Sequence, residues 1–204
     1  MRFILASNNK GKLRELKDIL SELDIDAQVV SQREAGYEIE AEETGTTFAE
    51  NARIKAKAAL DVSGEPCIAD DSGLCVDALG GAPGVYSARY GGEGLSDDDK
   101  ILLLLKNMED KEQRSARFVS SIACVFPNGD TLKSEGVCEG IILREKRGEN
   151  GFGYDPVFYL PELGKSMAEL SEEEKNRVSH RGKAARAFGE KLLEYMKGKK
   201  YADK

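Results

Sequence analysis

Residues 2–23 have the sequence RFILASNNKGKLRELKDILSEL, and this stretch decides the fold class. Its first residues, Arg2 to Ala6, are mostly apolar and predict a short buried strand. The polar residues Ser7 to Lys12 follow as a loop, and leucine or isoleucine then recurs every three or four positions up to Leu23. This spacing predicts an amphipathic helix. A strand, a loop large enough to hold a phosphate and a helix, in this order, are typical of an α/β protein.

Strand and helix patterns also alternate further along the chain. A second strand is predicted near residues 27–30, and a capping pattern predicts a helix over about residues 47–60. The middle of the chain favours antiparallel pairing instead, because alternating residues at 117–126 meet the turn signal Asn128-Gly129 before a partner strand at 131–137. We therefore expect a mixed α/β fold in which two lobes surround a cleft.

The composition excludes several classes of protein. The 204 residues carry a formal net charge of −7, which argues against nucleic-acid binding because a phosphate backbone requires a basic face. No apolar run approaches the roughly 20 residues that cross a bilayer, so we expect a cytoplasmic protein that does not bind membranes. The four cysteines are widely spaced and are expected to be reduced packing residues rather than zinc ligands. The single histidine, His180, excludes a multi-histidine metal centre.

The loop after the first strand is a candidate phosphate site. It places a hydroxyl, two amides and two ammonium groups at a helix N-terminus, where unpaired backbone N–H groups and the helix dipole favour an anion. It is not a Walker A motif, and a polar turn with solvated lysines is the alternative interpretation. The candidate phosphate ligands are Ser7, Asn8, Asn9, Lys10, Gly11 and Lys12.

Carboxylates occur in two adjacent pairs, Glu42-Glu43 in a predicted loop and Asp70-Asp71 at the end of a strand predicted at residues 66–69. Adjacent carboxylates repel one another unless a cation or a proton relieves them, and an all-oxygen site suits Mg²⁺ or Mn²⁺. The alternatives are a solvated face for the glutamates and a cap or turn for the aspartates. Because the spacing does not match the aspartyl-phosphate phosphatases, water is the expected nucleophile.

A base site is predicted near the end of the chain. Residues 151–155 combine two glycines with Phe152 and Tyr154, so a planar base can approach and stack there while backbone groups contact its edge. Core packing beside a turn is the alternative. Lys175, His180 and Arg181 lie before or at the start of the last helix, where donors can face an anion or a carbonyl oxygen.

Eight motifs are distributed along nearly the whole chain, from Ser7 to Arg181. They are Ser7-x-Asn9-x-x-Lys12, Glu42-Glu43-Thr44-Gly45, Phe48-x-Glu50-Asn51-Ala52, Ala69-Asp70-Asp71-Ser72-Gly73-Leu74, Leu79-Gly80-Gly81-x-Pro83-Gly84-x-Tyr86-Ser87-Ala88-Arg89-Tyr90, Gly151-Phe152-Gly153-Tyr154-Asp155-Pro156, Glu174-Lys175-Asn176 and Ser179-His180-Arg181. In order and spacing, the sequence resembles the inosine triphosphate pyrophosphatases, also called non-canonical purine NTP pyrophosphatases or the Ham1-like family.

The resemblance implies Mg²⁺-dependent hydrolysis of ITP, dITP and XTP to the monophosphate and pyrophosphate, by a homodimer that cleans the nucleotide pool. It implies one domain over residues 1–204, with a long mixed sheet and two α/β lobes flanking an active-site cleft. Asp71 would activate water and Lys55 would act on the phosphates, with Glu42 or Glu43 and Asp71 holding the metal. The implied nucleotide contacts are residues 7–12, Lys55, Ser72, Phe152, Gly153, Tyr154, Asp155, Lys175, His180 and Arg181.

Two other functions fit the same residues. One is a nucleotide-binding sensor without turnover, which the paired acids make less favoured. The other is a metal-dependent phosphohydrolase that releases orthophosphate. Identification of the phosphorus products formed from ITP separates all three functions.

Overall fold

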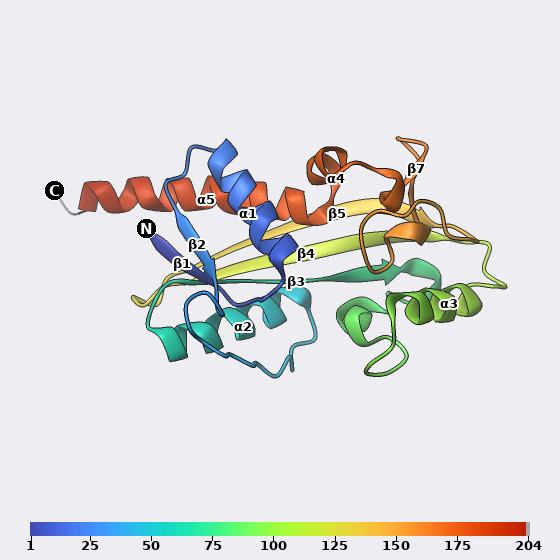
Figure 1. The fold of residues 1–204 in the computed structure, drawn as a ribbon, viewed down its shortest axis with the longest axis horizontal. Coiled ribbons are helices and arrows are strands. Elements are labelled where there is room, and N and C mark those ends of the chain that lie inside the picture. Colours follow the sequence, from blue (N-terminus) through green and yellow to red (C-terminus); the bar gives the residue numbers. More distant parts are fainter. Residues whose placement is uncertain (203–204) are drawn as a thin grey trace. The chain divides into compact units, whose positions relative to one another are not determined.

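The computed structural model describes the backbone of residues 1–202, with helices and strands alternating at both ends of the chain (Figure 1). The strands are β1 (Arg2–Leu5), β2 (Gln28–Ser31), β3 (Cys67–Val76), β4 (Ser115–Val125), β5 (Thr131–Ile142), β6 (Phe158–Leu160) and β7 (Lys165–Ser166). The α-helices are α1 (Lys10–Glu22), α2 (Phe48–Ser63), α3 (Asp97–Asn107), α4 (Glu172–Val178) and α5 (His180–Ala202). Short 3₁₀ helices are η1 (Asp77–Leu79), η2 (Gly84–Arg89), η3 (Asp155–Val157) and η4 (Met167–Glu169).

The seven strands form one mixed sheet in the order β2-β1-β3-β4-β5-β6-β7. Strand β1 is parallel to both β2 and β3, with Ile4 opposite Val30 on one side and Cys67 on the other. Strand β6 is antiparallel to β5 and to β7. The prediction of a mixed α/β fold with a long central sheet is therefore confirmed.

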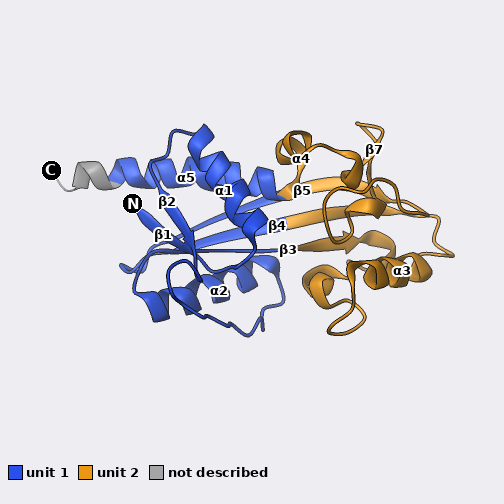
Figure 2. Ribbon diagram, in the orientation of Figure 1, with its two compact units in different colours: residues 1–71, 120–136, 181–204 blue, residues 72–119, 137–180 orange. Residues whose placement is uncertain are grey.

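The chain forms two compact units, which are coloured separately in Figure 2. Unit 1 consists of residues 1–71, 120–136 and 181–204, and unit 2 consists of residues 72–119 and 137–180. Each of β3, β4 and β5 contributes residues to both units.

Unit 1 has a helical layer on each face of its strands (Figure 1). Phe3 and Leu5 of β1 belong to a buried cluster with apolar residues of α1 and α5, whereas Ile4 belongs to a second cluster with the alanines of α2. Successive residues of a strand point to opposite faces, so parity along the strand decides which helix a side chain meets. Phe3, Ile4 and Leu5 are almost completely buried, as expected for a parallel strand covered on both faces.

Unit 2 has its own core. Ile101 and Leu104 of α3 pack there with Phe118, Tyr154 and Phe158. The core therefore joins α3 to the chain that surrounds the predicted base site.

The helix start predicted near residue 47 from a capping pattern is confirmed. Helices α2, α3 and α4 each begin with a capping box, in which the N-cap side chain and the acid three residues later bond each other's backbone N–H groups. The hairpin turn at Asn128-Gly129 also forms, with the Gly129 amide donating to the Phe126 carbonyl at 3.0 Å. Its strands are longer at their outer ends than predicted.

One predicted strand boundary is wrong. Strand β3 does not end at Ala69 but continues through Asp70 and Asp71 to Val76. Strand β6 begins only at Phe158, because the preceding residues form the 3₁₀ turn η3 around Pro156, which lacks an N–H group to donate to a ladder. Among the helices of the described chain, none is both long and apolar enough for a membrane span.

Candidate active site

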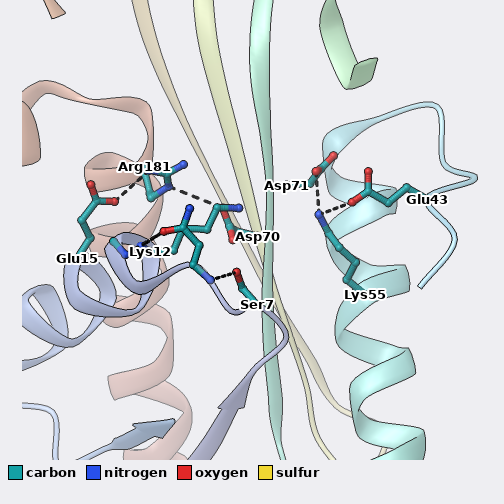
Figure 3. Close-up of polar contacts among 10 residues, drawn as sticks. Ser7, Lys12, Glu15, Glu43, Lys55, Asp70, Asp71 and Arg181 are labelled. Atoms are coloured by element: carbon teal, nitrogen blue, oxygen red, sulfur yellow. Dashed lines mark hydrogen bonds and ion pairs between the residues drawn. The ribbon is translucent and has the colours of Figure 1, made fainter. Parts of the chain in front are cut away.

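Asp70 and Asp71 lie in unit 1, on opposite faces of β3 (Figure 3). Asp70 faces the side of α1 and α5, where it contacts Lys12 and Arg181. Asp71 faces α2, where it contacts Lys55. The strand continues through both acids because each carboxylate meets a cation from a different segment, a tertiary effect that local sequence does not reveal.

On the first face, Asp70 forms ion pairs with two cationic side chains. Its Oδ2 atom lies 2.8 Å from Lys12 Nζ and 3.7 Å from Arg181 Nε, and Arg181 Nη1 lies 3.2 Å from Glu15 Oε2. Burial by itself would raise the pKa of Asp70, but Lys12 and Arg181 outweigh it and lower the pKa to about 2. Asp70 is therefore an ionised, buried anchor for a lysine of the predicted phosphate loop.

The phosphate loop itself is ordered by Asn9, the N-cap of α1. Asn9 Oδ1 accepts from the amides of Gly11 and Lys12 at 2.9 and 3.1 Å, and the Asn9 amide donates to Ser7 Oγ at 3.1 Å. Two of the orphan amides that were predicted to face an anion are thus used by Asn9. Asn8 and Lys10 are exposed at the same helix start, where the positive end of the helix dipole lies.

On the second face, Lys55 bridges two carboxylates. Its Nζ atom lies 2.9 Å from Asp71 Oδ1 and 2.9 Å from Glu43 Oε1. Burial raises the pKa of Asp71 more than Lys55 lowers it, and the nearby Glu43 carboxylate raises it further. Burial lowers the pKa of Lys55, but the two acids reverse this effect and raise it above the usual lysine value. Asp71 is therefore the more basic carboxylate of the two aspartates, as a proton acceptor requires.

The two glutamates of the predicted metal site differ. Glu42 is exposed, whereas the Glu43 side chain is only 26% exposed and reaches the Lys55 ammonium. Glu43 and Asp71 thus converge on one cationic position. Within the described residues, no cluster of three or more histidine, cysteine or acidic side chains surrounds a point. A pair of carboxylates fits Mg²⁺, which keeps several waters and binds phosphate oxygens in addition to one or two protein ligands.

Asn51 has a role that was not predicted from the sequence, although it lies in the motif Phe48-x-Glu50-Asn51-Ala52. It is completely buried, its Nδ2 atom donates to Asp71 Oδ2 at 3.3 Å, and its Oδ1 atom accepts from the Gly45 amide at 2.8 Å. A Cβ atom at position 45 would lie 2.6 Å from Asn51 Oδ1, so only glycine permits this approach. Asn51 connects the loop that carries Glu43 to the Asp71 carboxylate. Its spacing of four from Lys55 was the available signal.

The predicted base loop, residues 151–155, lies in unit 2. Phe152 is 52% exposed, and Lys175 Nζ lies 4.6 Å from the centre of its ring. Lys175 also donates to Asp155 Oδ2 at 2.6 Å, and the same oxygen accepts from the Phe152 amide at 2.9 Å. Tyr154 is buried in the core, with burial raising its pKa, so Phe152 is the aromatic ring that this loop presents to solvent.

The remaining predicted site residues are placed as follows. Ser72 is half-buried in β3, directly after Asp71. His180 is buried at the start of α5 and stacks on Phe118 with 4.8 Å between ring centroids. Unit 1 holds residues 7–12, Glu42, Glu43, Lys55, Asp70, Asp71 and Arg181, and unit 2 holds Ser72, residues 152–155, Lys175 and His180.

Comparison with known proteins gives consistent matches along the chain. The sequence profile of the Ham1 family matches residues 3–191. The dITP/XTP pyrophosphatase of Staphylococcus epidermidis is 46% identical over 198 residues, 97% of each chain. That of Desulforamulus reducens is 53% identical over 187 residues, 90% of this chain and 92% of the relative.

Solved structures agree with these matches. The Ham1 protein of Staphylococcus aureus superposes with a TM-score of 0.88 at 43% identity, covering 96% of this chain and 100% of that one. A HAM1 protein from Coxiella burnetii gives a TM-score of 0.89 at 44% identity, covering 95% and 99%.

Proposed function

The chain belongs to the Ham1 family, and from this premise we propose that it hydrolyses hypoxanthine- and xanthine-containing nucleoside triphosphates, namely ITP, dITP and XTP, to the monophosphate and pyrophosphate. The observation that carries the proposal is the Asp71 carboxylate, whose pKa is raised by burial while Lys55 and Asn51 fix its orientation. A nucleotide sensor has no need for such a base. The curated relatives, named as pyrophosphatases of dITP and XTP, support the substrate class.

In the proposed reaction, one water molecule is added across the bridge between the α and β phosphates. The water oxygen bonds to the α phosphorus, its proton passes to Asp71, and the bond from the α phosphorus to the bridging oxygen breaks. Pyrophosphate leaves with the electron pair of that bond. The contact with Asn51 keeps Asp71 in one orientation, and Lys55 offsets the negative charge that gathers around Asp71 and Glu43.

We propose Glu43 and Asp71 as the protein ligands of Mg²⁺, with Mn²⁺ as a substitute. Both carboxylates already face one cationic group, and both offer the hard oxygen donors that this ion prefers. When bound, the ion would offset the charge of the triphosphate and lower the pKa of bound water. Asp70 is committed to Lys12 and Arg181, and Glu42 is exposed, so neither is assigned to the ion.

Lys12 and the start of α1 are proposed to receive the phosphates, and the exposed Phe152 ring to stack on the base. The test is to incubate the protein with ITP and Mg²⁺, without added pyrophosphatase, and to identify the phosphorus products. IMP and pyrophosphate should form together. IDP with orthophosphate would indicate the phosphohydrolase, and tight binding without products would indicate the sensor.

We also propose that the chain, with a mass of 22.3 kDa, acts as a cytoplasmic homodimer in which residues 1–204 form one pyrophosphatase domain. The proposal rests on family membership. Light scattering at micromolar concentration should give a mass of about twice the chain mass, and a monomer mass would contradict the dimer.

A further inference from the structure

Asp97, the first residue of α3, has a carboxylate that joins two other segments of unit 2. Its Oδ2 atom accepts from the backbone amide of Gly153 at 2.8 Å. Its Oδ1 atom lies 2.7 Å from Lys100 Nζ, and the buried Lys100 side chain also donates to the Ala88 carbonyl at 3.3 Å. The base loop is thereby connected to α3 and to η2 through one acid and one lysine.

The next residue of the base loop has a second connection to η2. Tyr154 donates its hydroxyl to the Ser87 carbonyl at 2.9 Å. Ser87 is itself fixed, because its Oγ atom donates to the Gly84 carbonyl at 2.7 Å and accepts from the Leu74 amide at 2.8 Å. Two consecutive residues of the loop are therefore attached to a buried, hydrogen-bonded support.

The Asp97 contact determines how the exposed ring is held. The peptide group between Phe152 and Gly153 donates its N–H to Asp97, and its carbonyl accepts from the Asp155 amide at 3.3 Å. A peptide group bonded at both ends cannot rotate freely, and Phe152 is attached directly to it. Gly153 has a φ of +59°, a left-handed conformation that glycine adopts without strain.

Helix capping does not explain Asp97. Ser96 is the N-cap of α3, and Asp99 completes the capping box. The bond with Lys100 lowers the pKa of Asp97, with the Gly153 amide adding to the effect, so the group is ionised at neutral pH. Its neighbour Asp98 instead pairs with Lys146 at the exposed surface.

We propose that Asp97, supported by Lys100, is a positioning residue for base recognition, which fixes the Phe152–Gly153 peptide and so the orientation of the ring on which the purine stacks. This inference rests on the proposed function, in which Phe152 receives the base. Guanine differs from hypoxanthine by a 2-amino group. A fixed ring and backbone cannot move to accommodate the 2-amino group, whereas a loop released from Asp97 can.

The test compares Asp97→Asn with Asp98→Asn. Both variants remove one negative charge from the first turn of α3, and only Asp97 contacts the loop. Steady-state kinetics with ITP and GTP, together with calorimetric dissociation constants for IMP and for pyrophosphate, measure base and phosphate binding separately. For Asp97→Asn we expect KM for ITP and Kd for IMP to rise about tenfold, the scale of one lost hydrogen bond to a charged group.

For the same variant, kcat and the Kd of pyrophosphate should change less than about twofold, and the preference for ITP over GTP should narrow. Asp98→Asn should match the wild type in every measurement. Lys100→Met should repeat the effect of Asp97→Asn, and Lys100→Arg should restore part of it. If Asp97→Asn gives too little folded protein, the two Lys100 variants carry the comparison.

Equal behaviour of Asp97→Asn and Asp98→Asn would overturn the positioning role, as would an equal loss of IMP and pyrophosphate binding. A preference for ITP over GTP that stays unchanged in both Asp97→Asn and Lys100→Met would also overturn it. A wild-type protein that neither cleaves ITP nor binds IMP would instead contradict the proposed function, so the two failures are distinguishable.

Discussion

Replacing Asp70 by asparagine is expected to destabilise the fold, whereas the same substitution at the adjacent Asp71 is expected to remove turnover. The two residues have the same side chain and lie on the same strand, but they face opposite sides of the sheet. Asp70 meets Lys12 and Arg181, and Asp71 meets Lys55 and Asn51.

The size of the destabilisation follows from the pKa of Asp70, which is 3.8 for an unperturbed aspartate and about 2 in the folded chain. A carboxyl group with this difference stabilises the fold by about 2 kcal/mol above pH 4, and the contribution is lost as the pH falls toward 2. For a chain of this size, about 2 kcal/mol corresponds to a decrease in Tm of about 4–8 °C. The asparagine variant should show this decrease at pH 7, and its difference from the wild type should shrink between about pH 4 and pH 2.

The pKa of Asp71 shifts in the opposite direction, because burial raises it and disfavours the ionised form in the folded chain. Asp71→Asn should therefore keep its Tm within about 2 °C of the wild type, while kcat falls by about 10²-fold or more, as for the loss of a general base. Asp70→Asn should keep kcat within about tenfold.

The assays are thermal unfolding across pH and steady-state hydrolysis of ITP, with Asp70→Asn and Asp71→Asn as controls for each other. An equal decrease in Tm for both variants, or a near-normal kcat for Asp71→Asn, would refute the assignment.

Three further predictions concern metal, base and selectivity. Glu43→Gln should raise the Mg²⁺ concentration for half-maximal activity at least about tenfold, while Glu42→Gln leaves it unchanged, and equal effects in a magnesium titration would contradict the assignment. Phe152→Ala should raise KM for ITP by about 5- to 150-fold, from about 1–3 kcal/mol of stacking; a loss confined to kcat would argue against stacking. Arg181→Ala should lower the ratio of kcat/KM for ITP to that for ATP, because the Arg181 guanidinium suits a 6-oxo group. The ratio of kcat/KM for ITP to that for GTP should stay nearly unchanged. Full retention of the ITP/ATP ratio would exclude this role.

The sequence predicted helix starts and turns correctly where they depend on interactions between neighbouring residues. The capping box at Thr47 and the turn at Asn128-Gly129 act within a few residues, and each formed as expected. The end of β3 was misplaced because two adjacent acids resemble a strand end until their distant cations are known.

The residue types of the site could be predicted from the sequence, but many of the contacts between them could not. Paired acids indicated a cation, but which member of each pair meets Lys55 depends on strand parity and burial. The hydrogen bond from the Gly153 amide to Asp97 joins residues 56 positions apart, and no periodicity or motif predicts such a contact. Tyr154 was expected at the base, and its hydroxyl instead joins the core through Ser87.

The placement of Asp70 and Asp71 on opposite faces also limits how this chain can change in length. Because side chains alternate along β3, inserting or deleting one residue just before Asp70 would move each acid to the other layer and about 3.3 Å along the strand. Lys12 and Lys55, fixed on separate helices, could not follow. Variation in length among related chains should therefore accumulate in turns such as residues 161–164, whereas the count of residues from Cys67 to Asp71 should stay constant.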